Sequence, residues 1–433
     1  MSRADAILIF KAAVAAVQPA SLMQQHIHVQ SNVLTVCEQQ FQLSPATTVW
    51  IFGAGKAAAS MAHAVEQILE TLPLKGLVIT KYGHALPLRQ VKVAEADHPL
   101  PDEDGVKATT QLIAQLQTVQ PDDVVLFLLS GGASALLADY PAGADLLQTQ
   151  EVFSLLLKSG ADIYEMNTVR KHLSAVKGGQ LALLANTTAW CTLILSDVVG
   201  DDLSVIGSGP TVADPSTFNE AIHILDKYHL TDKLPPAIYQ HLRQGSIGKI
   251  AETPKPGHPG LQHVHNFLIG SNQIALKAAQ ITANQLGYDT QILTTTATGS
   301  VTSLANYLIS TAQEWEGKKP ACLLMGGEST VTVTGSGKGG RNQQLALEAG
   351  ILLHKLPGIL LLSAGTDGTD GPTDAAGAFA DQDLMLHATA EGLNATAFLQ
   401  QHDAYHFFEK AGGLVKTGPT QTNVMDIMLV IIY

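Results

Sequence analysis

Three predominantly apolar segments in the first half of the chain each end in a turn of small residues. Residues 48–52, 123–129 and 190–195 run directly into Gly53-Ala54-Gly55-Lys56, Ser130-Gly131-Gly132-Ala133-Ser134 and Ser196-Asp197. An apolar strand, a tight turn and then a helix is the pattern of βαβ units, which build parallel sheets. We therefore expect a Rossmann-like parallel sheet. Ligands of such sheets bind beyond the carboxyl ends of the strands, where these turns lie.

The chain is long enough for more than one domain. Its 433 residues suggest two or three domains. The stretch 234–259 is rich in Pro, Lys and Gly and is the best linker candidate. We expect an α/β protein with a Rossmann-like N-terminal domain at 1–245, a smaller α/β domain at 255–433 and a cleft between them. Near the N-terminus we expect helices over 4–17 and 22–40.

Composition disfavours several classes of partner. The net charge of −13 disfavours a nucleic-acid or anionic-membrane surface, and no apolar run approaches the length of a membrane span. The three cysteines lack CxxC spacing, which favours reduced thiols and a cytoplasmic location. A homodimer is compatible with the sequence, which does not give the oligomeric state.

The stretch 323–350 predicts an anion site in the second half of the chain. An apolar strand stops at Gly326-Gly327-Glu328, and a glycine-rich loop at 335–340 leads into a helix that begins at Arg341. Glycines let backbone N–H groups approach an anion, and a helix N-terminus adds partial positive charge. Arg341 supplies a planar fork of donors for phosphate or carboxylate. A plain turn between core elements is the alternative.

The two glycine turns of the first half match no nucleotide motif in full. Gly53-Ala54-Gly55-Lys56 lacks the spacing of a P-loop, and the third glycine of a dinucleotide fingerprint falls at Ala58. Ser130–Ser134 lacks the Gly-x-Ser-x-Gly of a serine nucleophile, so phosphate binding by backbone N–H groups is the better interpretation.

Acidic residues at strand ends are candidates for holding Mg²⁺. Asp197 follows an apolar strand, whereas Asp201 and Asp202 could be helix caps. Glycines are interleaved with Asp367, Asp370 and Asp374. These acids are equally compatible with a second acidic wall of a site for a metal-bound nucleotide and with a plain turn. His98 is the only histidine with a suggestive setting, a loop beside Asp97 and Pro99, and a structural role is favoured for it.

Taken together, these motifs resemble the glycerate 2-kinase family that carries a C-terminal MOFRL domain. The resemblance extends over nearly the whole chain and rests on segments in the same order: 52–57, 95–103, 129–136, 167–179, 195–210, 326–328, 339–343, 365–371 and 417–420. It implies a Rossmann-like domain and a smaller second domain, and transfer of the γ-phosphoryl of ATP to D-glycerate with Mg²⁺.

The resemblance also implies roles for particular residues. The invariant lysine, aspartate and arginine of the family correspond to Lys56, Asp197 and Arg341, which we expect to be catalytic. Asp197 would hold Mg²⁺, with Glu328 as a second ligand, or would accept the hydroxyl proton. Nucleotide binding is expected from Gly53, Gly55, Ser130, Gly131, Gly132, Ser134, Gly326, Gly327 and Asp367. The alternatives are an NAD(P)H-dependent hydroxypyruvate reductase and a non-catalytic anion-binding protein.

Overall fold

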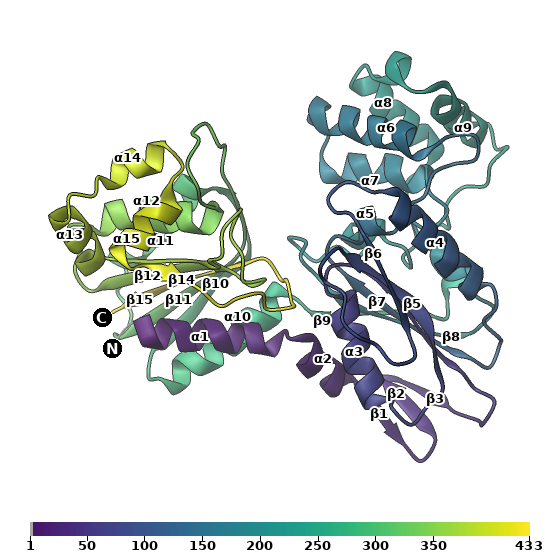
Figure 1. Cartoon of the computed structure of the whole chain (residues 1–433), viewed down its shortest axis with the longest axis horizontal. Coiled ribbons are helices and arrows are strands. Elements are labelled where there is room, and N and C mark those ends of the chain that lie inside the picture. The colour runs from purple at the N-terminus through teal and green to yellow at the C-terminus, as the bar shows by residue number, and fades with distance from the viewer. Residues whose placement is uncertain (1–2) are drawn as a thin grey trace. The chain divides into compact units, whose positions relative to one another are not determined.

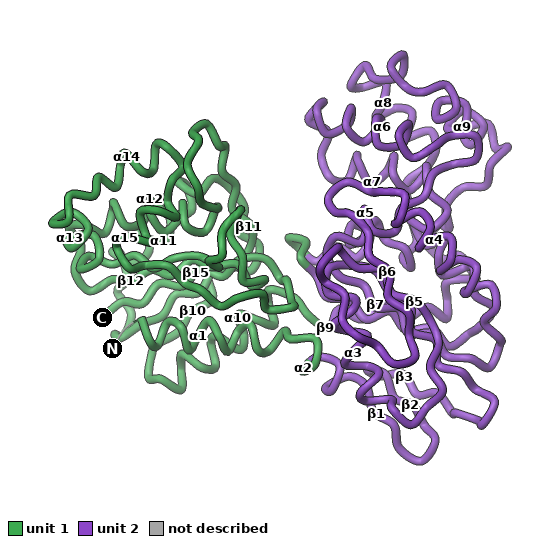
Figure 2. The backbone as a smooth tube through the Cα atoms, in the orientation of Figure 1, with its two compact units in different colours: residues 1–21, 197–200, 270–433 green, residues 22–196, 201–269 purple. Residues whose placement is uncertain are grey.

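The computed structural model describes residues 3–433 (Figure 1). Packing divides the chain into two compact units, coloured separately in Figure 2. Unit 1 contains residues 1–21, 197–200 and 270–433, and unit 2 contains residues 22–196 and 201–269. These boundaries differ from the expected 1–245 and 255–433, because the N-terminal helix packs with the C-terminal half. Each unit is described by itself below.

Unit 2 is built on a six-stranded sheet with the order β6-β5-β4-β7-β8-β9. The five strands from β6 to β8 are parallel, as the sequence predicts. Numbered within the unit, this is the 3-2-1-4-5-6 order of doubly wound sheets, whose ligands bind where the order reverses, between β4 and β7. The strands are β4 (Val49–Ala54), β5 (Leu74–Lys81), β6 (Lys92–Ala96), β7 (Val124–Ser130), β8 (Ala189–Leu195) and β9 (Val264–Gly270).

A group of four helices packs around its own core in unit 2 (Figure 1). The expected linker at 234–259 is wrong, because α9 forms there and buries Ile238 and Leu242 in this core. The helices of unit 2 are α3 (Ala58–Ile68), α4 (Glu103–Leu116), α5 (Ala133–Leu136), the core-forming α6 (Leu146–Ser159), α7 (Ile163–His172), α8 (Phe218–Lys227) and α9 (Pro236–Ser246), and short 3-10 turns at 181–184, 206–208, 231–233 and 259–261.

The expected helix at 22–40 is also wrong. Only α2 (Pro19–His26) is helical, and the rest forms an antiparallel sheet of β1 (Ile27–Gln30), β2 (Val33–Val36) and β3 (Gln39–Gln42). Ser31 and Asn32 join β1 to β2 with φ of 52° and 63°. Two consecutive positive φ values are those of the tight hairpin turn that suits twisted strands. Leu34 and Val36 alternate with less buried neighbours, a strand period.

Unit 1 contains a mixed sheet with the order β10-β11-β15-β12-β13-β14. β10 and β11 are parallel, and the remaining pairs are antiparallel. The C-terminal strand β15 therefore lies inside the sheet, and all its residues are buried. The strands are β10 (Asp289–Ser300), β11 (Ala321–Thr330), β12 (Ile359–Gly365), β13 (Gly377–Asp381), β14 (Leu414–Val415) and β15 (Asp426–Ile432).

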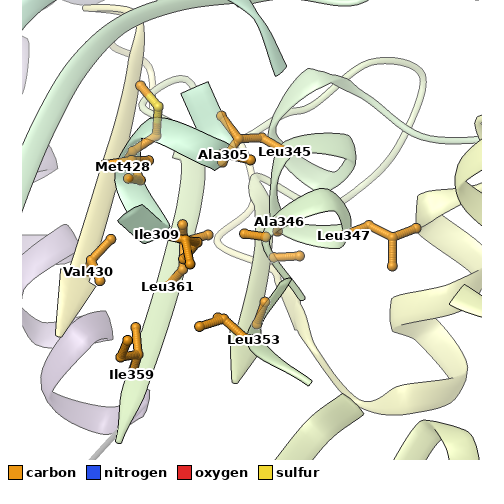
Figure 3. Close-up of a cluster of buried hydrophobic side chains, with 14 of the residues drawn as sticks. Ala305, Ile309, Leu345, Ala346, Leu347, Leu353, Ile359, Leu361, Met428 and Val430 are labelled. Carbon is orange, nitrogen blue, oxygen red and sulfur yellow. The ribbon is translucent and has the colours of Figure 1, made fainter. Parts of the chain in front are cut away.

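Helices cover both faces of this sheet (Figure 1). On one face, α12 (Arg341–Leu353) places Leu345 and Leu353 against Leu361 and Val430 of the sheet (Figure 3). The same face carries α11 (Val301–Gln313), α13 (Gln382–Ala390), α14 (Ala395–Gln400) and α15 (Ala404–Ala411). The other face carries α10 (Asn272–Gln285) with α1 (Arg3–Ala16) packed along it.

The hydrogen bond from Tyr288 to Asp5 ties α1 into unit 1. Within residues 3–433, a membrane-spanning length and composition is reached only by α1 and α2 taken together, which are bent by 50°, and by no single helix.

Candidate active site

Close contact between β4 and β7 requires one glycine near the end of β4 and another directly after it. A Cβ atom on Gly53 would lie 2.5 Å from the carbonyl oxygen of Leu128. Gly55 has a φ of 135° and faces Ser130 so closely that a side chain would collide with it. The two turns are then joined by hydrogen bonds from Lys56 N to Gly131 O (2.9 Å) and from Ala57 N to Ser130 Oγ (3.0 Å). Gly53, Gly55 and Ser130 therefore shape the site where the strand order reverses.

Two backbone donors at this point have no acceptor. Among residues 3–433, no group accepts a hydrogen bond from the backbone N–H of Gly131 or Gly132. Gly132 has a φ of 86°, and a Cβ atom there would lie 3.0 Å from His98 Cδ2 and 3.4 Å from Lys56 Cε. The Lys56 and His98 side chains thus pass beside this glycine. Unsatisfied N–H groups next to a lysine are the arrangement that binds an anion.

Ser134 lies in a polar chain beside the same turn. Its Oγ is 2.8 Å from Ser208 Oγ, which in turn donates to Asn167 Oδ1 at 2.8 Å. The Asn167 side chain is buried, and its Nδ2 has no hydrogen-bond partner within the described residues. Ser134 is thereby oriented by a buried network.

His98 is neutral at physiological pH. Burial lowers its pKa to about 4, helped by the positive charges of Lys56 and Lys81. Its backbone N–H donates to Asp97 Oδ1 at 2.7 Å, which holds the loop. Sequence reasoning favoured a structural role for His98, whereas the structure places its ring beside Lys56 and Gly132.

Arg341 in unit 1 is held by two carboxylates. Its Nε donates to Asp426 Oδ2 (2.6 Å) and its Nη2 to Asp426 Oδ1 (3.1 Å), while Nη1 donates to Glu328 Oε1 (2.6 Å). Asp426 is buried and also accepts a hydrogen bond from Asn342 Nδ2 at 2.9 Å. The guanidinium is therefore fixed in orientation but keeps further N–H groups for a ligand.

The helix N-terminus behind Arg341 already holds an anion, which is Asp370. Its carboxylate accepts hydrogen bonds from the backbone N–H groups of Asn342 (3.1 Å) and Gln343 (2.8 Å). Lys338 lies over the ring of Tyr405, 4.4 Å from its centroid. The prediction that this helix end binds an external anion is therefore wrong for its amides. Burial raises the pKa of Asp370 to about 6.

The glycine pair on β11 is required for packing. A side chain on Gly326 would collide with Asn272, whose Nδ2 donates to Val424 O (2.9 Å) and Asp426 O (3.0 Å). Gly327 has a φ of 149° and is crowded by Ala297 of β10. Nucleotide binding at Gly326 and Gly327 stays a prediction.

The predicted acidic residues lie in separate settings within unit 1. Asp197 accepts a hydrogen bond from Asn423 Nδ2 at 3.2 Å, and Asp367 accepts one from its own turn, Thr369 N, at 3.0 Å. No group of three His, Cys, Asp or Glu side chains in residues 3–433 could hold a metal ion by itself. Mg²⁺ in phosphoryl-transfer sites needs only few carboxylates, because phosphate and water supply the rest. The chemistry of Asp197 and Glu328 fits that requirement.

Lys56 belongs to unit 2, whereas Asp197 and Arg341 belong to unit 1. The expectation that they share a cleft stays a prediction.

Comparison with known proteins finds relatives that match nearly the whole chain. Residues 5–243 match the family described as a domain of unknown function, DUF4147, and residues 321–426 match the MOFRL family. The glycerate 2-kinase of Pyrococcus horikoshii is 40% identical over 97% of this chain and 95% of its own length. This chain belongs to the glycerate 2-kinase family. A crystal structure of glycerate kinase from Thermotoga maritima superposes with a TM-score of 0.87 at 38% identity, covering 99% of both chains.

Some of the similar proteins carry a different name. One protein of Agrobacterium vitis, provisionally named a hydroxypyruvate reductase, is 41% identical over 88% of this chain and 86% of its own length. A reductase of this fold would bind a dinucleotide through three spaced glycines after the first strand, the third of which is alanine in some proteins. Here the third position is Ala58, the first residue of α3.

Sequence reasoning missed Asp426, which holds Arg341. It stands at the start of the apolar C-terminal strand, and no spacing connects it to a residue 85 positions earlier. An isolated acid at the start of a fully buried strand was the available signal.

Proposed function

We propose that the protein is a glycerate 2-kinase, which transfers the γ-phosphoryl group of ATP to the 2-hydroxyl of D-glycerate. The observation that carries the proposal is the pair of unsatisfied N–H groups at Gly131 and Gly132 beside Lys56, at the reversal point of a doubly wound sheet. Phosphoryl transfer needs positioning and charge neutralisation, which such a group of donors supplies. The glycerate kinases among the relatives support this reaction.

In unit 2, the backbone of Gly131 and Gly132 would hold phosphate oxygens, and Ser134 would donate a further hydrogen bond. Gly53, Gly55 and Ser130 would contribute by shaping the turn. Lys56 would neutralise charge on a phosphate oxygen or the glycerate carboxylate, as a compact charge on a flexible stem does. A neutral His98 beside it would add no competing charge.

In unit 1, Arg341 would bind a phosphate or carboxylate through its remaining N–H groups. Asp197, with Glu328, would hold Mg²⁺, or Asp197 would accept the hydroxyl proton. Mg²⁺ held by these carboxylates would supply positive charge that offsets the charge of the phosphates. Gly326, Gly327 and Asp367 would border the nucleotide. Arg341, Asp426, Glu328 and an ionised Asp370 sum to a net charge of −2, so an anion binding here requires a cation with it.

Hydroxypyruvate reduction is the second candidate, favoured only by the names of the Agrobacterium vitis relatives. A single experiment separates the two activities. Purified protein is supplied with D-glycerate, ATP and Mg²⁺ while ADP release is followed, and separately with hydroxypyruvate and NADH or NADPH while the absorbance of the cofactor is followed. ADP release that depends on glycerate supports the proposal. Cofactor oxidation without ADP release would replace it with the reductase.

A further inference from the structure

A cavity of about 350 Å³ opens next to the Gly131-Gly132 turn and lies wholly within unit 2. Its walls come from the loop after His98, the start of α5, and helices α6 and α7, which Figure 1 shows at one end of the sheet. Most of the lining is apolar, including Leu100, Phe153, Leu157 and Met166. Gly132 and Ser134 line the cavity as well as the anion-binding turn, so the two spaces are continuous.

Two polar side chains in the cavity have groups that form no hydrogen bond with another described residue. The Arg170 guanidinium lies over the ring of Phe153, 5.1 Å from its centroid, and no carboxylate within residues 3–433 pairs with it. Gln150 donates through Nε2 to Pro101 O at 2.5 Å, and nothing in the described chain donates to its Oε1. A planar cation stacked on an aromatic ring, with one free amide acceptor, is a surface suited to a flat heteroaromatic ring.

Glycerate, the phosphoryl acceptor of the proposed reaction, does not explain this cavity. Glycerate is a three-carbon polyhydroxy acid without an apolar surface, whereas the cavity falls within the range of about 300–1,000 Å³ typical of sites for larger, partly apolar ligands. The nucleotide has such a part in its base and ribose. Its phosphates would lie on the Gly131-Gly132 turn, at the mouth of the cavity.

We infer that this cavity binds the nucleoside end of the nucleotide, with the base stacked against Phe153 and Arg170. The inference rests on the proposed function, because it takes the nucleotide to be a substrate. Gln150 Oε1 would accept a hydrogen bond from an exocyclic amino group of the base. The competing occupant is glycerate, with its carboxylate on Arg170.

The test compares a ligand that carries a nucleoside with a ligand that consists of phosphates alone. ADP and inorganic tripolyphosphate are titrated by calorimetry, with Mg²⁺, into the full-length protein and its variants. Phe153→Leu removes the ring but keeps an apolar side chain, and it should weaken ADP binding about tenfold, the scale of one base-stacking contact. Tripolyphosphate binding should not change.

Helix α6 offers a matched pair of variants at exposed leucines. Leu157 lines the cavity and is 69% exposed, whereas Leu147 is 74% exposed and does not line it. Leu157→Ala should weaken ADP binding about fivefold through lost apolar contact, and Leu147→Ala should leave it unchanged. Both variants should retain the wild-type melting temperature, because neither side chain is buried.

Arg170→Met distinguishes the two occupants of the cavity. If Arg170 stacks on the base, ADP binds more weakly while the KM for glycerate and the affinity for tripolyphosphate stay the same. A raised KM for glycerate with unchanged ADP binding would overturn the inference in favour of glycerate. Equal ADP affinity in wild type, Phe153→Leu and Leu157→Ala would also overturn it while leaving the kinase proposal standing. Wild-type protein that binds neither ADP nor ATP would instead refute the proposed function.

Discussion

Asp426 accepts two hydrogen bonds from the guanidinium of Arg341, from Nε to Oδ2 at 2.6 Å and from Nη2 to Oδ1 at 3.1 Å. This bidentate pair fixes the plane of the guanidinium. The Glu328 carboxylate accepts a hydrogen bond from a third N–H group. Asp426 is buried and is the first residue of β15, a strand inside the sheet. The sheet therefore fixes its position. Arg341 is therefore preorganised by the core of unit 1.

Replacing Asp426 should harm both folding and activity. Asp426→Asn keeps the shape but removes the charge that faces Arg341. Breaking a fully buried ion pair costs about 3–5 kcal/mol, and the cost here should be smaller because the Arg341 side chain is 34% exposed. We expect a lower free energy of unfolding in urea and a lower kcat/KM per folded molecule. Asp381→Asn is the matched control, because Asp381 makes the same bidentate pair with Arg3. An equal loss of activity in the control would show that only stability matters.

Lys56→Ala should remove activity without unfolding the protein. Lys56 lies just before Ala57, the N-cap of α3, where a positive charge gains nothing from the helix dipole and slightly opposes it. The melting temperature without ligand should be unchanged or slightly raised, while kcat/KM should fall by about 2–4 kcal/mol, as for one preorganised electrostatic contact. Lys56→Arg should restore only part of the activity. Lys107→Ala, an exposed lysine on α4, is the control with no expected effect. Unfolding of Lys56→Ala with normal activity per folded molecule would mean that Lys56 is structural.

The pKa of His98 should depend on Lys56. Burial is the main reason that its pKa is near 4, and the Lys56 charge is the next. Lys56→Ala should therefore raise the His98 pKa part of the way toward 6.5, measured by NMR titration of the ring. The pKa of His98 is lower in the folded protein than in the unfolded chain. The contribution of His98 to the free energy of unfolding is therefore full above about pH 6.5 and is lost as the pH falls from about 6.5 to 4. An unchanged His98 pKa in Lys56→Ala would show that the two side chains do not interact.

Asp197 should be needed for turnover but not for the fold. Asp197→Asn removes the charge that would bind Mg²⁺ or accept a proton, while the amide can keep a polar contact with Asn423. We expect strongly reduced kcat with little change in melting temperature, and loss of wild-type activity in excess chelator. Asn423→Ala, which removes the partner alone, should have a smaller effect. Full activity of Asp197→Asn would exclude Asp197 from the mechanism.

The parallel sheet and its glycine turns were predictable because their signals are local. An apolar run followed by glycines predicts a strand and then a turn, although β4 continues through Gly53 and Ala54 before it turns at Gly55. The β1–β3 sheet was missed because Ser31 and Asn32 specify a turn only through their φ values. The assignment of α1 to unit 1 depends on contacts with α10, more than 250 residues away, which no window of sequence contains.

The candidate site was predictable where one turn supplies several groups, and not where distant segments meet. Lys56 and Gly132 follow from short motifs. Asp370 accepts hydrogen bonds at the N-terminus of α12, and Asp426 accepts them from Arg341. Sheet register and packing produce both contacts. A basic residue at a helix start therefore signals a need for negative charge, which the chain itself can satisfy.

The most direct test of the account is the identity of the product formed from D-glycerate, ATP and Mg²⁺. Phosphorus NMR of the reaction mixture distinguishes phosphate on the 2-hydroxyl from phosphate on the 3-hydroxyl and reports ADP at the same time. The account predicts 2-phosphoglycerate and ADP in equal amounts, formed by the wild-type protein and not by Lys56→Ala. No phosphorylated glycerate, together with oxidation of NADH or NADPH by hydroxypyruvate, would contradict it.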